Sequence, residues 1–203
     1  MGFNFDPKQY IRTVPDWPEK GVQFRDITPL LEHPLGFRQT MDQMVYPFME
    51  EGIDLVVGID ARGFIFGAAM AYQLGCGFVP VRKKGKLPYN SISVSYELEY
   101  GTAEVEMHVD AIKPGQKVLI VDDLIATGGT MLAAYELIKQ MDANVVAACA
   151  VIENPYAGRY EPDLMPFMAE LRSLGTLLAQ ELVDTLGKDN VEVYSKAAIV
   201  GVN

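Results

Sequence analysis

Short apolar runs alternate with helix-forming stretches between residues 55 and 152, and this alternation limits the fold more than any other feature. The apolar runs predict buried strands, which we expect at residues 55–59, 78–81, 118–121 and 145–152. Helices are expected over 64–74, ended by Gly75, and over 130–141. Strands that alternate with helices are typical of a parallel sheet. We therefore expect an α/β fold, a mostly parallel twisted sheet flanked by helices.

Two stretches depart from this pattern. Residues 104–109 alternate polar and apolar side chains, which predicts a half-exposed strand. Residues 83–95 contain Gly85, Pro88 and three serines, a composition typical of a loop, and we expect this loop to be mobile. Pro80 lacks the N–H that a strand donates, so its strand is expected to be irregular or at an edge.

The chain carries 17 Lys and Arg against 27 Asp and Glu, a net charge of −10. This balance argues against nucleic acid or an anionic membrane as a partner. Apolar residues make up 49 % of the chain, enough for a buried core, yet no window reaches the roughly 18 consecutive apolar residues of a membrane span. Two cysteines and an N-terminus without a signal-like apolar stretch indicate a reducing compartment, so we expect a cytoplasmic protein.

The stretch from residue 118 to 130 reads Val-Leu-Ile-Val-Asp-Asp-Leu-Ile-Ala-Thr-Gly-Gly-Thr. Two carboxylates, Asp122 and Asp123, follow a buried strand at the end where parallel sheets bind ligands. The glycine-bearing loop behind them enters a helix, so its N–H groups and the helix N-terminus favour a phosphate. Ionised carboxylates accept hydrogen bonds from sugar hydroxyls. A sugar phosphate is therefore the ligand that this stretch predicts.

Other interpretations of this stretch fit less well. Gly128 and Gly129 alone could form a tight turn, with the acids capping the next helix. The lysine that follows the glycines of a P-loop is missing, and so is the Gly-x-Gly-x-x-Gly pattern of dinucleotide sites.

The stretch resembles the phosphoribosyl-diphosphate (PRPP) signature of the type I phosphoribosyltransferases. The resemblance implies that Asp122 and Asp123 hold the ribose hydroxyls. It also implies that the 5′-phosphate is held by the loop residues Ala126, Thr127, Gly128, Gly129 and Thr130.

Four further stretches, 21–31, 57–64, 83–88 and 96–101, are similar to segments of adenine phosphoribosyltransferases, and the resemblance extends over about residues 15–150. It implies a type I phosphoribosyltransferase fold with a mobile catalytic loop and a small N-terminal hood. The implied activity is transfer of the 5-phosphoribosyl group from PRPP to adenine, giving AMP and diphosphate in purine salvage. Mg²⁺ is expected to arrive on PRPP without direct protein ligands, and the protein is expected to be a homodimer.

The resemblance also assigns roles to side chains that the leaving group contacts. Arg62 is expected to bind the diphosphate, although a surface ion pair is the simpler interpretation of such an arginine. Lys83, with Lys86 nearby, is expected to reach the diphosphate, whereas lysines in a loop are usually only solvated. The family has a cis peptide in this region, which here would join Asp60 and Ala61.

The remaining roles concern the base. Glu99 is the expected general acid/base, and Tyr100 belongs to the same motif. Phe24 and Leu124 are expected to sandwich the adenine ring, and the backbone around Arg25 to read its edge. For Phe24, an ordinary core position is the alternative.

Residues 1–152 are expected to form the phosphoribosyltransferase core with its hood. Residues 153–203 depart from the family and resemble the opening portion of proteins labelled "amino acid synthesis family". A helix and a strand are expected in this segment, packed on the same domain.

Two alternative functions remain open from the sequence. A PRPP-sensing regulator would need no Glu99 and would usually carry a basic nucleic-acid-binding surface. A phosphoribosyltransferase for another base, such as guanine, xanthine or orotate, is the alternative within the enzyme class.

Overall fold

A computed structural model describes residues 6–97, 102–125 and 128–153 of the chain. These residues form three 3₁₀ or short α-helical segments, three longer α-helices and eight strands. In chain order they are η1 (Pro7–Tyr10), β1 (Arg12–Pro15), β2 (Gln23–Asp26), α1 (Thr28–Glu32), α2 (Pro34–Val45), η2 (Tyr46–Phe48), β3 (Leu55–Ile59), α3 (Gly63–Leu74), β4 (Gly77–Lys83), β5 (Ser91–Glu97), β6 (Thr102–His108), β7 (Lys117–Ile125), α4 (Gly129–Lys139) and β8 (Asn144–Glu153).

Six strands form one sheet in the order β5-β6-β4-β3-β7-β8. The four strands from β4 to β8 run parallel to their neighbours, and β6 and β5 add two antiparallel strands at one side. The predicted mostly parallel sheet is therefore confirmed, and so are the strands expected at 55–59 and 145–152 and the helix that ends before Gly75.

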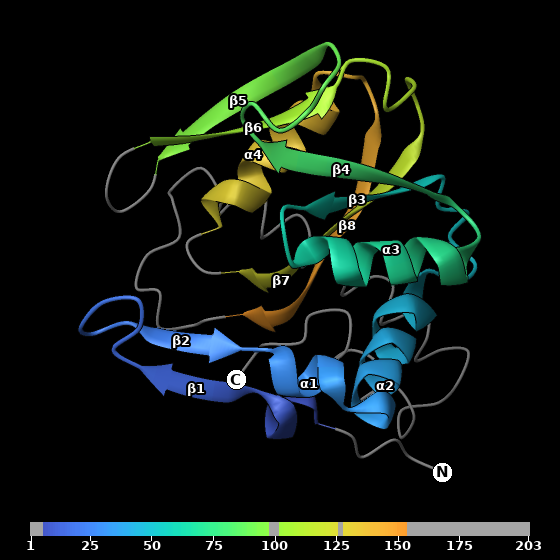
Figure 1. Ribbon diagram of the computed structural model, residues 1–203. Coiled ribbons are helices and arrows are strands. Elements are labelled where there is room, and N and C mark those ends of the chain that lie inside the picture. Colours follow the sequence, from blue (N-terminus) through green and yellow to red (C-terminus); the bar gives the residue numbers. More distant parts are fainter. Residues whose placement is uncertain (1–5, 98–101, 126–127, 154–203) are drawn as a thin grey trace.

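Helices cover both faces of this sheet (Figure 1). On one face, Leu137 and Ile138 of α4 pack against Val118 and Ile120 of β7. On the other face, Phe66 and other apolar residues of α2 and α3 pack on Leu119 and Val121. Strand β7 is apolar on both faces because both faces are covered, as parallel strands require.

The order of the strands creates a crevice at one place in the sheet. Strands β3 and β7 are neighbours, but α3 leads from β3 outward to β4 whereas α4 leads from β7 outward to β8. The two right-handed crossovers therefore diverge, and the loops after β3 and β7 are left facing each other. Ligands of open α/β sheets bind at such a point.

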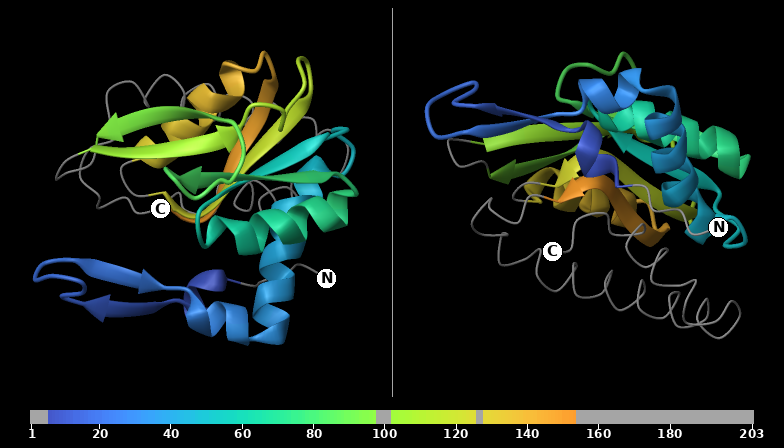
Figure 2. Two further views of the ribbon diagram at one scale, coloured as in Figure 1. Left: turned by 45° about the horizontal axis from the view of Figure 1, so that its top comes forward. Right: turned by 90° about the horizontal axis from the view of Figure 1, so that it is seen from below.

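Strands β1 and β2 form a separate antiparallel hairpin that pairs Thr13 with Arg25. The hairpin, α1 and α2 lie together beside the main sheet, as Figures 1 and 2 show. Helix α2 begins at Pro34, and the Nδ1 atom of His33 accepts a hydrogen bond of 2.9 Å from the Gly36 N–H, which caps it.

One prediction about strands is wrong. The segment 83–95 is not one loop, because Lys83 ends β4 and β5 begins at Ser91. The serines of β5 alternate with Ile92, Val94 and Tyr96, which pack on the core, so this is an ordinary strand pattern that the serine content obscured.

Pro80 lies in β4, an interior strand, rather than in an edge strand. The Val81 carbonyl faces β3 and accepts from the Asp60 N–H at 2.9 Å, so the Pro80 nitrogen faces β6. Strand β6 pairs with β4 only at Arg82 and Lys83. The N–H group that Pro80 lacks would therefore face a stretch where β6 does not pair with β4. Of the two predicted alternatives, an irregular position or an edge position, the structure shows the irregular one.

Among the described residues, none of the helices combines the length and the apolarity that a membrane-spanning helix needs. The segment expected to diverge, 153–203, lies outside the described residues except for Glu153 at the end of β8.

Candidate active site

The two adjacent acids of the predicted signature lie inside β7, not after it. The strand continues to Ile125 because β8 pairs with it as far as Glu153, with Asp122 opposite Ala150 and Leu124 opposite Ile152. The strand expected at 118–121 is thus longer than predicted. Its last residues bring Asp122, Asp123 and the half-buried Leu124 to the crevice at the carboxyl end of the sheet.

The acids differ in burial. Asp123 is only 4 % exposed, whereas Asp122 is half-buried. The Oδ1 atom of Asp122 accepts a hydrogen bond of 2.8 Å from the Asp123 N–H. Burial, together with the neighbouring charge of Asp123, raises the pKa of Asp122 to about 8. In the free protein, Asp122 is therefore an acid that keeps its proton far above the pH at which an exposed aspartate loses it.

Arg62 lies between β3 and α3 and reaches across to β7. Its Nε atom is 2.8 Å from Oδ2 of Asp123, with the arginine side chain 38 % and the aspartate side chain 6 % exposed. The N–H direction does not meet hydrogen-bond geometry, so within the described residues Oδ2 of Asp123 has a charge partner but no hydrogen-bond donor. An ion pair was the simpler interpretation of Arg62 from the sequence, but its partner is a buried acid of the candidate site rather than a surface group.

The same guanidinium contacts the N-terminal hairpin. The Cζ atom of Arg62 lies 5.3 Å from the ring centroid of Phe24, a cation–π distance. The ring of Trp17 packs edge-on against the Phe24 ring, with the two centroids 4.4 Å apart. Phe24 is half-buried and belongs to neither core cluster. The alternative that Phe24 is an ordinary core residue is therefore wrong.

Arg25, the next residue of β2, is also half-buried. Its guanidinium donates to the hydroxyl of Thr13 on the opposite strand of the hairpin. The side chain is therefore engaged within the hairpin.

Gly63 begins α3 where the helix approaches β7 closely. A Cβ atom at this position would lie 2.7 Å from the carbonyl oxygen of Val121 and 3.0 Å from Oδ1 of Asp122. Only glycine allows this approach, which places the start of α3 directly against the first acid.

The loop between β3 and α3 contains the expected cis peptide bond between Asp60 and Ala61. The carboxylate of Asp60 accepts from Nε of Arg82 on β4 at 3.2 Å. Arg82 and Asp60 were not predicted as site residues. The sequence offers a weak indication of both, since each polar residue directly follows an apolar strand core at the carboxyl edge of the sheet.

Lys83 and Lys86 are exposed and flank the turn that follows β4. Within the described residues, neither ammonium group has a hydrogen-bond or ion-pair partner. Lys84 between them donates to Ser93 at 2.9 Å and to Glu104 at 3.0 Å.

The candidate phosphate loop leads from β7 into α4. Gly128 and Gly129 are buried, and Thr130 is half-buried in the first turn of α4. The predicted loop residues Ala126 and Thr127, together with Glu99 and Tyr100 of the catalytic motif, lie outside the described residues.

The structure therefore brings Arg62, Asp122, Asp123 and Phe24 together, from three segments far apart in the sequence. The structure also places Trp17 at this site. The sequence gave no functional signal for Trp17, because it is an exposed aromatic residue in a proline-containing hairpin loop.

Comparisons with known proteins point to a single family. The phosphoribosyl transferase domain family model matches residues 30–168. The adenine phosphoribosyltransferase of Chromobacterium violaceum is 59 % identical over 151 residues, which are 74 % of this chain and 78 % of that protein. The crystal structure of adenine phosphoribosyltransferase from Rhodothermus marinus matches with a TM-score of 0.71 and 54 % identity, over 74 % of this chain and 85 % of that one.

The adenine phosphoribosyltransferase of Saccharomyces cerevisiae, crystallised with an imino-altritol bisphosphate and adenine, matches with a TM-score of 0.70 and 41 % identity over 74 % of this chain and 88 % of that chain. The resemblance seen in the sequence motifs and the type I phosphoribosyltransferase fold are thereby confirmed. The chain belongs to the adenine phosphoribosyltransferase family.

Proposed function

We propose that this protein transfers the 5-phosphoribosyl group from PRPP to adenine and releases AMP and diphosphate, a pentosyl transfer of purine salvage. The observation that carries the proposal is the convergence of Arg62, Asp123 and Phe24 at the crevice between β3 and β7. A cation, an acid and an aromatic face are the groups that a diphosphate, a ribose and a flat base require.

For the sugar phosphate, we assign the ribose hydroxyls to Asp122 and Asp123. The 5′-phosphate is assigned to the loop from Ala126 to Thr130, where the amides and the N-terminus of α4 supply partial positive charge. Positive charge develops at C1′ when the bond to diphosphate breaks, and a nearby ionised carboxylate stabilises it.

Arg62 is assigned to the leaving diphosphate, which gains negative charge in the transition state. The exposed ammonium groups of Lys83 and Lys86 are the second source of positive charge. Arg62 must exchange its contact with Asp123 for the diphosphate, so ligand binding leaves Asp123 free to accept from the ribose.

For the base, we assign stacking to Phe24 and Leu124, edge recognition to the backbone at Arg25, and proton transfer near the purine to Glu99, next to Tyr100. A backbone peptide suits adenine, because both present a donor and an acceptor.

Mg²⁺ fits this site as an ion that the substrate carries. Among the described residues, no group of three His, Cys, Asp or Glu side chains is placed to hold a metal. Oxygen atoms of diphosphate, ribose and water are the ligands that Mg²⁺ prefers, so an ion carried by PRPP needs few or no ligands from the protein. When bound, Mg²⁺ would offset charge on the leaving diphosphate.

We also propose that the protein is a homodimer and is cytoplasmic. Support for a dimer comes from the outer side of α3, where Ile65 is 41 % and Tyr72 is 88 % exposed although the helix is apolar all round. Support for a reducing compartment comes from Cys76 and Cys149, which are both free thiols.

The test is incubation of the full chain with PRPP, adenine and Mg²⁺, followed by chromatographic detection of AMP. Guanine, xanthine and orotate serve as competing bases. Formation of AMP with adenine as the preferred base supports the proposal. Binding of PRPP without formation of any nucleotide would instead identify a PRPP sensor.

A further inference from the structure

Glu106 is a carboxylate buried in a position where the sequence pattern predicts an exposed side chain. It lies on β6 between Val105 and Met107, whose side chains belong to the core. Successive strand residues point to opposite faces, so Glu106 points away from that core, yet it is only 2 % exposed. The segment after β4 folds back over it, and the mechanism assigned above makes no use of it.

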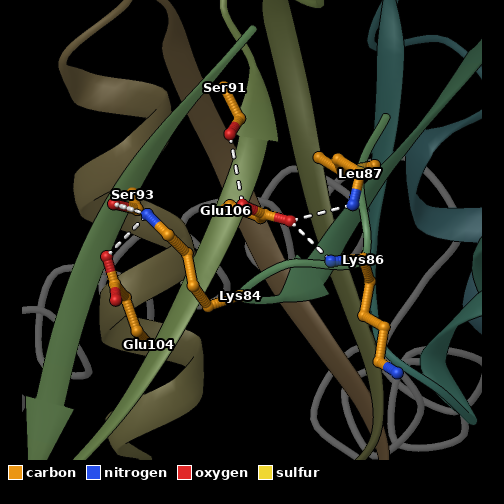
Figure 3. A network of polar contacts seen from close by, with 7 residues as sticks. All are labelled: Lys84, Lys86, Leu87, Ser91, Ser93, Glu104 and Glu106. Atoms are coloured by element: carbon orange, nitrogen blue, oxygen red, sulfur yellow. Dashed lines mark hydrogen bonds and ion pairs between the residues drawn. The ribbon is translucent and has the colours of Figure 1, made fainter. Parts of the chain in front are cut away.

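Both oxygens of the Glu106 carboxylate accept hydrogen bonds from that segment (Figure 3). Its Oε1 atom accepts from the N–H groups of Lys86 and Leu87, both at 2.9 Å. Its Oε2 atom accepts from the Ser91 hydroxyl at 3.1 Å. Burial opposes ionisation, but the N–H groups of Leu87, Gly85 and Lys86 and the Ser91 hydroxyl together lower the pKa of Glu106. The group is therefore a charged anchor for the backbone of the turn.

The anchored turn carries Lys83 and Lys86, whose ammonium groups have no partner among the described residues. Residues 83–86 form a β-turn closed by a hydrogen bond of 3.2 Å from the Lys86 N–H to the Lys83 carbonyl, with Gly85 at φ +80°. Such a turn needs positive φ at its third residue, which glycine supplies. Figure 3 shows the Lys86 side chain pointing away from Glu106, while Lys84 is turned toward Ser93 and Glu104.

The Lys86 peptide group is held from its other end by Arg82. Nη1 of Arg82 donates to the Lys86 carbonyl at 3.1 Å, and Nε of the same guanidinium lies 3.2 Å from Asp60. Arg82 and Glu106 are register partners on β4 and β6. Contacts therefore run from Glu106 through the Lys86 backbone and Arg82 to Asp60, two residues before Arg62.

We propose that Glu106 is a positioning residue, which with Arg82 fixes the lysine turn of residues 83–86 relative to the loop that carries Arg62. The two segments assigned to the diphosphate are then held at a set separation, before any ligand arrives. The inference rests on the proposed function and adds a residue that itself contacts no substrate. Its effect falls on the diphosphate end of the ligand and spares the 5′-phosphate and the base.

The experiment measures calorimetric binding of two probes, magnesium diphosphate and AMP, to wild-type protein and to Glu106→Ala. The variant is expected to bind diphosphate about tenfold or more weakly, the equivalent of one charge-assisted hydrogen bond, with AMP affinity changed less than about twofold. Glu106→Gln retains an acceptor for the two N–H groups and is expected to restore most of the diphosphate affinity. Glu104→Ala is the matched control, two residues away on the same strand, and is expected to bind both probes as wild type does.

Unchanged diphosphate affinity in folded Glu106→Ala overturns the inference, and so does an equal loss for both probes, which would indicate general structural damage. Should Glu106→Ala fail to fold, Arg82→Gln is used instead. It removes the hydrogen bond from Arg82 to the Lys86 carbonyl and must give the same selective loss of diphosphate affinity. Wild-type protein that binds neither probe overturns the proposed function itself, and the inference with it.

Discussion

The Nε atom of Arg62 lies 2.8 Å from Oδ2 of Asp123, and that oxygen has no hydrogen-bond donor within the described residues. The cation assigned to the leaving group therefore already balances a buried acid in the free protein. Under the proposed role, this pairing ties stability to binding, because Arg62 both neutralises Asp123 and is assigned to the diphosphate.

Arg62→Gln is expected to weaken both properties. Removing the charge leaves Asp123 buried and unpaired, which we expect to lower the free energy of unfolding by about 1–3 kcal/mol, below the usual cost for a fully buried pair because Arg62 is 38 % exposed. Urea denaturation at neutral pH measures this loss, and calorimetry measures diphosphate binding. Arg62→Lys keeps the charge but not the planar fork, so it should regain stability more fully than affinity. Equal stability of Arg62→Gln and wild type would contradict the expectation.

Asp122→Asn should stabilise the free protein in a pH-dependent way. The pKa of Asp122 is raised from 3.8 to about 8 on folding, so between these values the unfolded chain releases a proton that the folded protein retains. Wild-type stability should therefore decrease as the pH rises through this interval, and the asparagine variant should escape the decrease. At pH 8 we expect a gain of about 2–5 kcal/mol, given about 1.4 kcal/mol per pKa unit, and at about pH 4 no gain.

Scanning calorimetry of Asp122→Asn at several pH values checks the interval, with the exposed Asp110→Asn as control. A gain that is the same at every pH would show that the carboxyl group is not the cause. PRPP affinity should fall in the same variant, because an asparagine amide cannot ionise to accept from the ribose hydroxyls when PRPP binds.

Gly63→Ala should disturb the site through the backbone. Its Cβ would lie 2.7 Å from the Val121 carbonyl, so α3 must move away from β7. We expect a stability loss of about 1–3 kcal/mol and weaker PRPP binding. Gly75→Ala is the comparison, because its φ of +68° is unfavourable for alanine but no atom lies within 4 Å. That variant should lose about 1 kcal/mol and bind PRPP normally. Thermal unfolding and calorimetry on both variants separate the two effects.

Glu99→Ala should lower kcat by about 100-fold or more, the range expected for a lost general acid/base. PRPP affinity should change little, because the role assigned to Glu99 is proton transfer at the base. Steady-state kinetics with adenine as the varied substrate measure the effect, and turnover close to wild type would remove the assignment.

The dimer is expected to depend on the outer face of α3. Ile65 and Tyr72 lie seven residues apart on one side of this helix, so aspartate at both positions should place two charges in the contact between copies. Light scattering should report a monomer for the double variant and a dimer for wild type. Lys139→Glu is the control, because Lys139 lies on α4, on the opposite face of the sheet. This variant should remain a dimer. A wild-type monomer would refute the proposal.

Much of the fold could be predicted because burial on both faces leaves an unmistakable pattern. Strand β3 and the core of β7 consist of consecutive apolar residues, and Gly75 follows α3 at the expected position. The antiparallel side of the sheet was harder to predict. Strand β5 carries serines on its outer side, and Glu106 looks exposed until a distant turn closes over it.

The position of candidate site residues was predictable where one continuous segment carries them, as with Asp122 and Asp123 at the carboxyl end of β7. Contacts between segments were not predictable, because they depend on how β3, β4 and the hairpin are placed around β7. The pairing of Arg62 with Asp123 and that of Arg82 with Asp60 are of this kind. The proximity of Trp17 to Phe24 likewise follows from the hairpin's shape rather than from any motif.

In the part of the chain that the structure describes, the hairpin of β1 and β2 shares no strand pairing with the six-stranded sheet. Under the proposed roles, Phe24 and Arg25, assigned to the base, thus lie on a different unit from Asp122 and Asp123, assigned to the ribose. Under those roles, exchange of a few hairpin side chains is expected to change the heterocycle that is accepted and to leave binding of the phosphoribosyl donor intact.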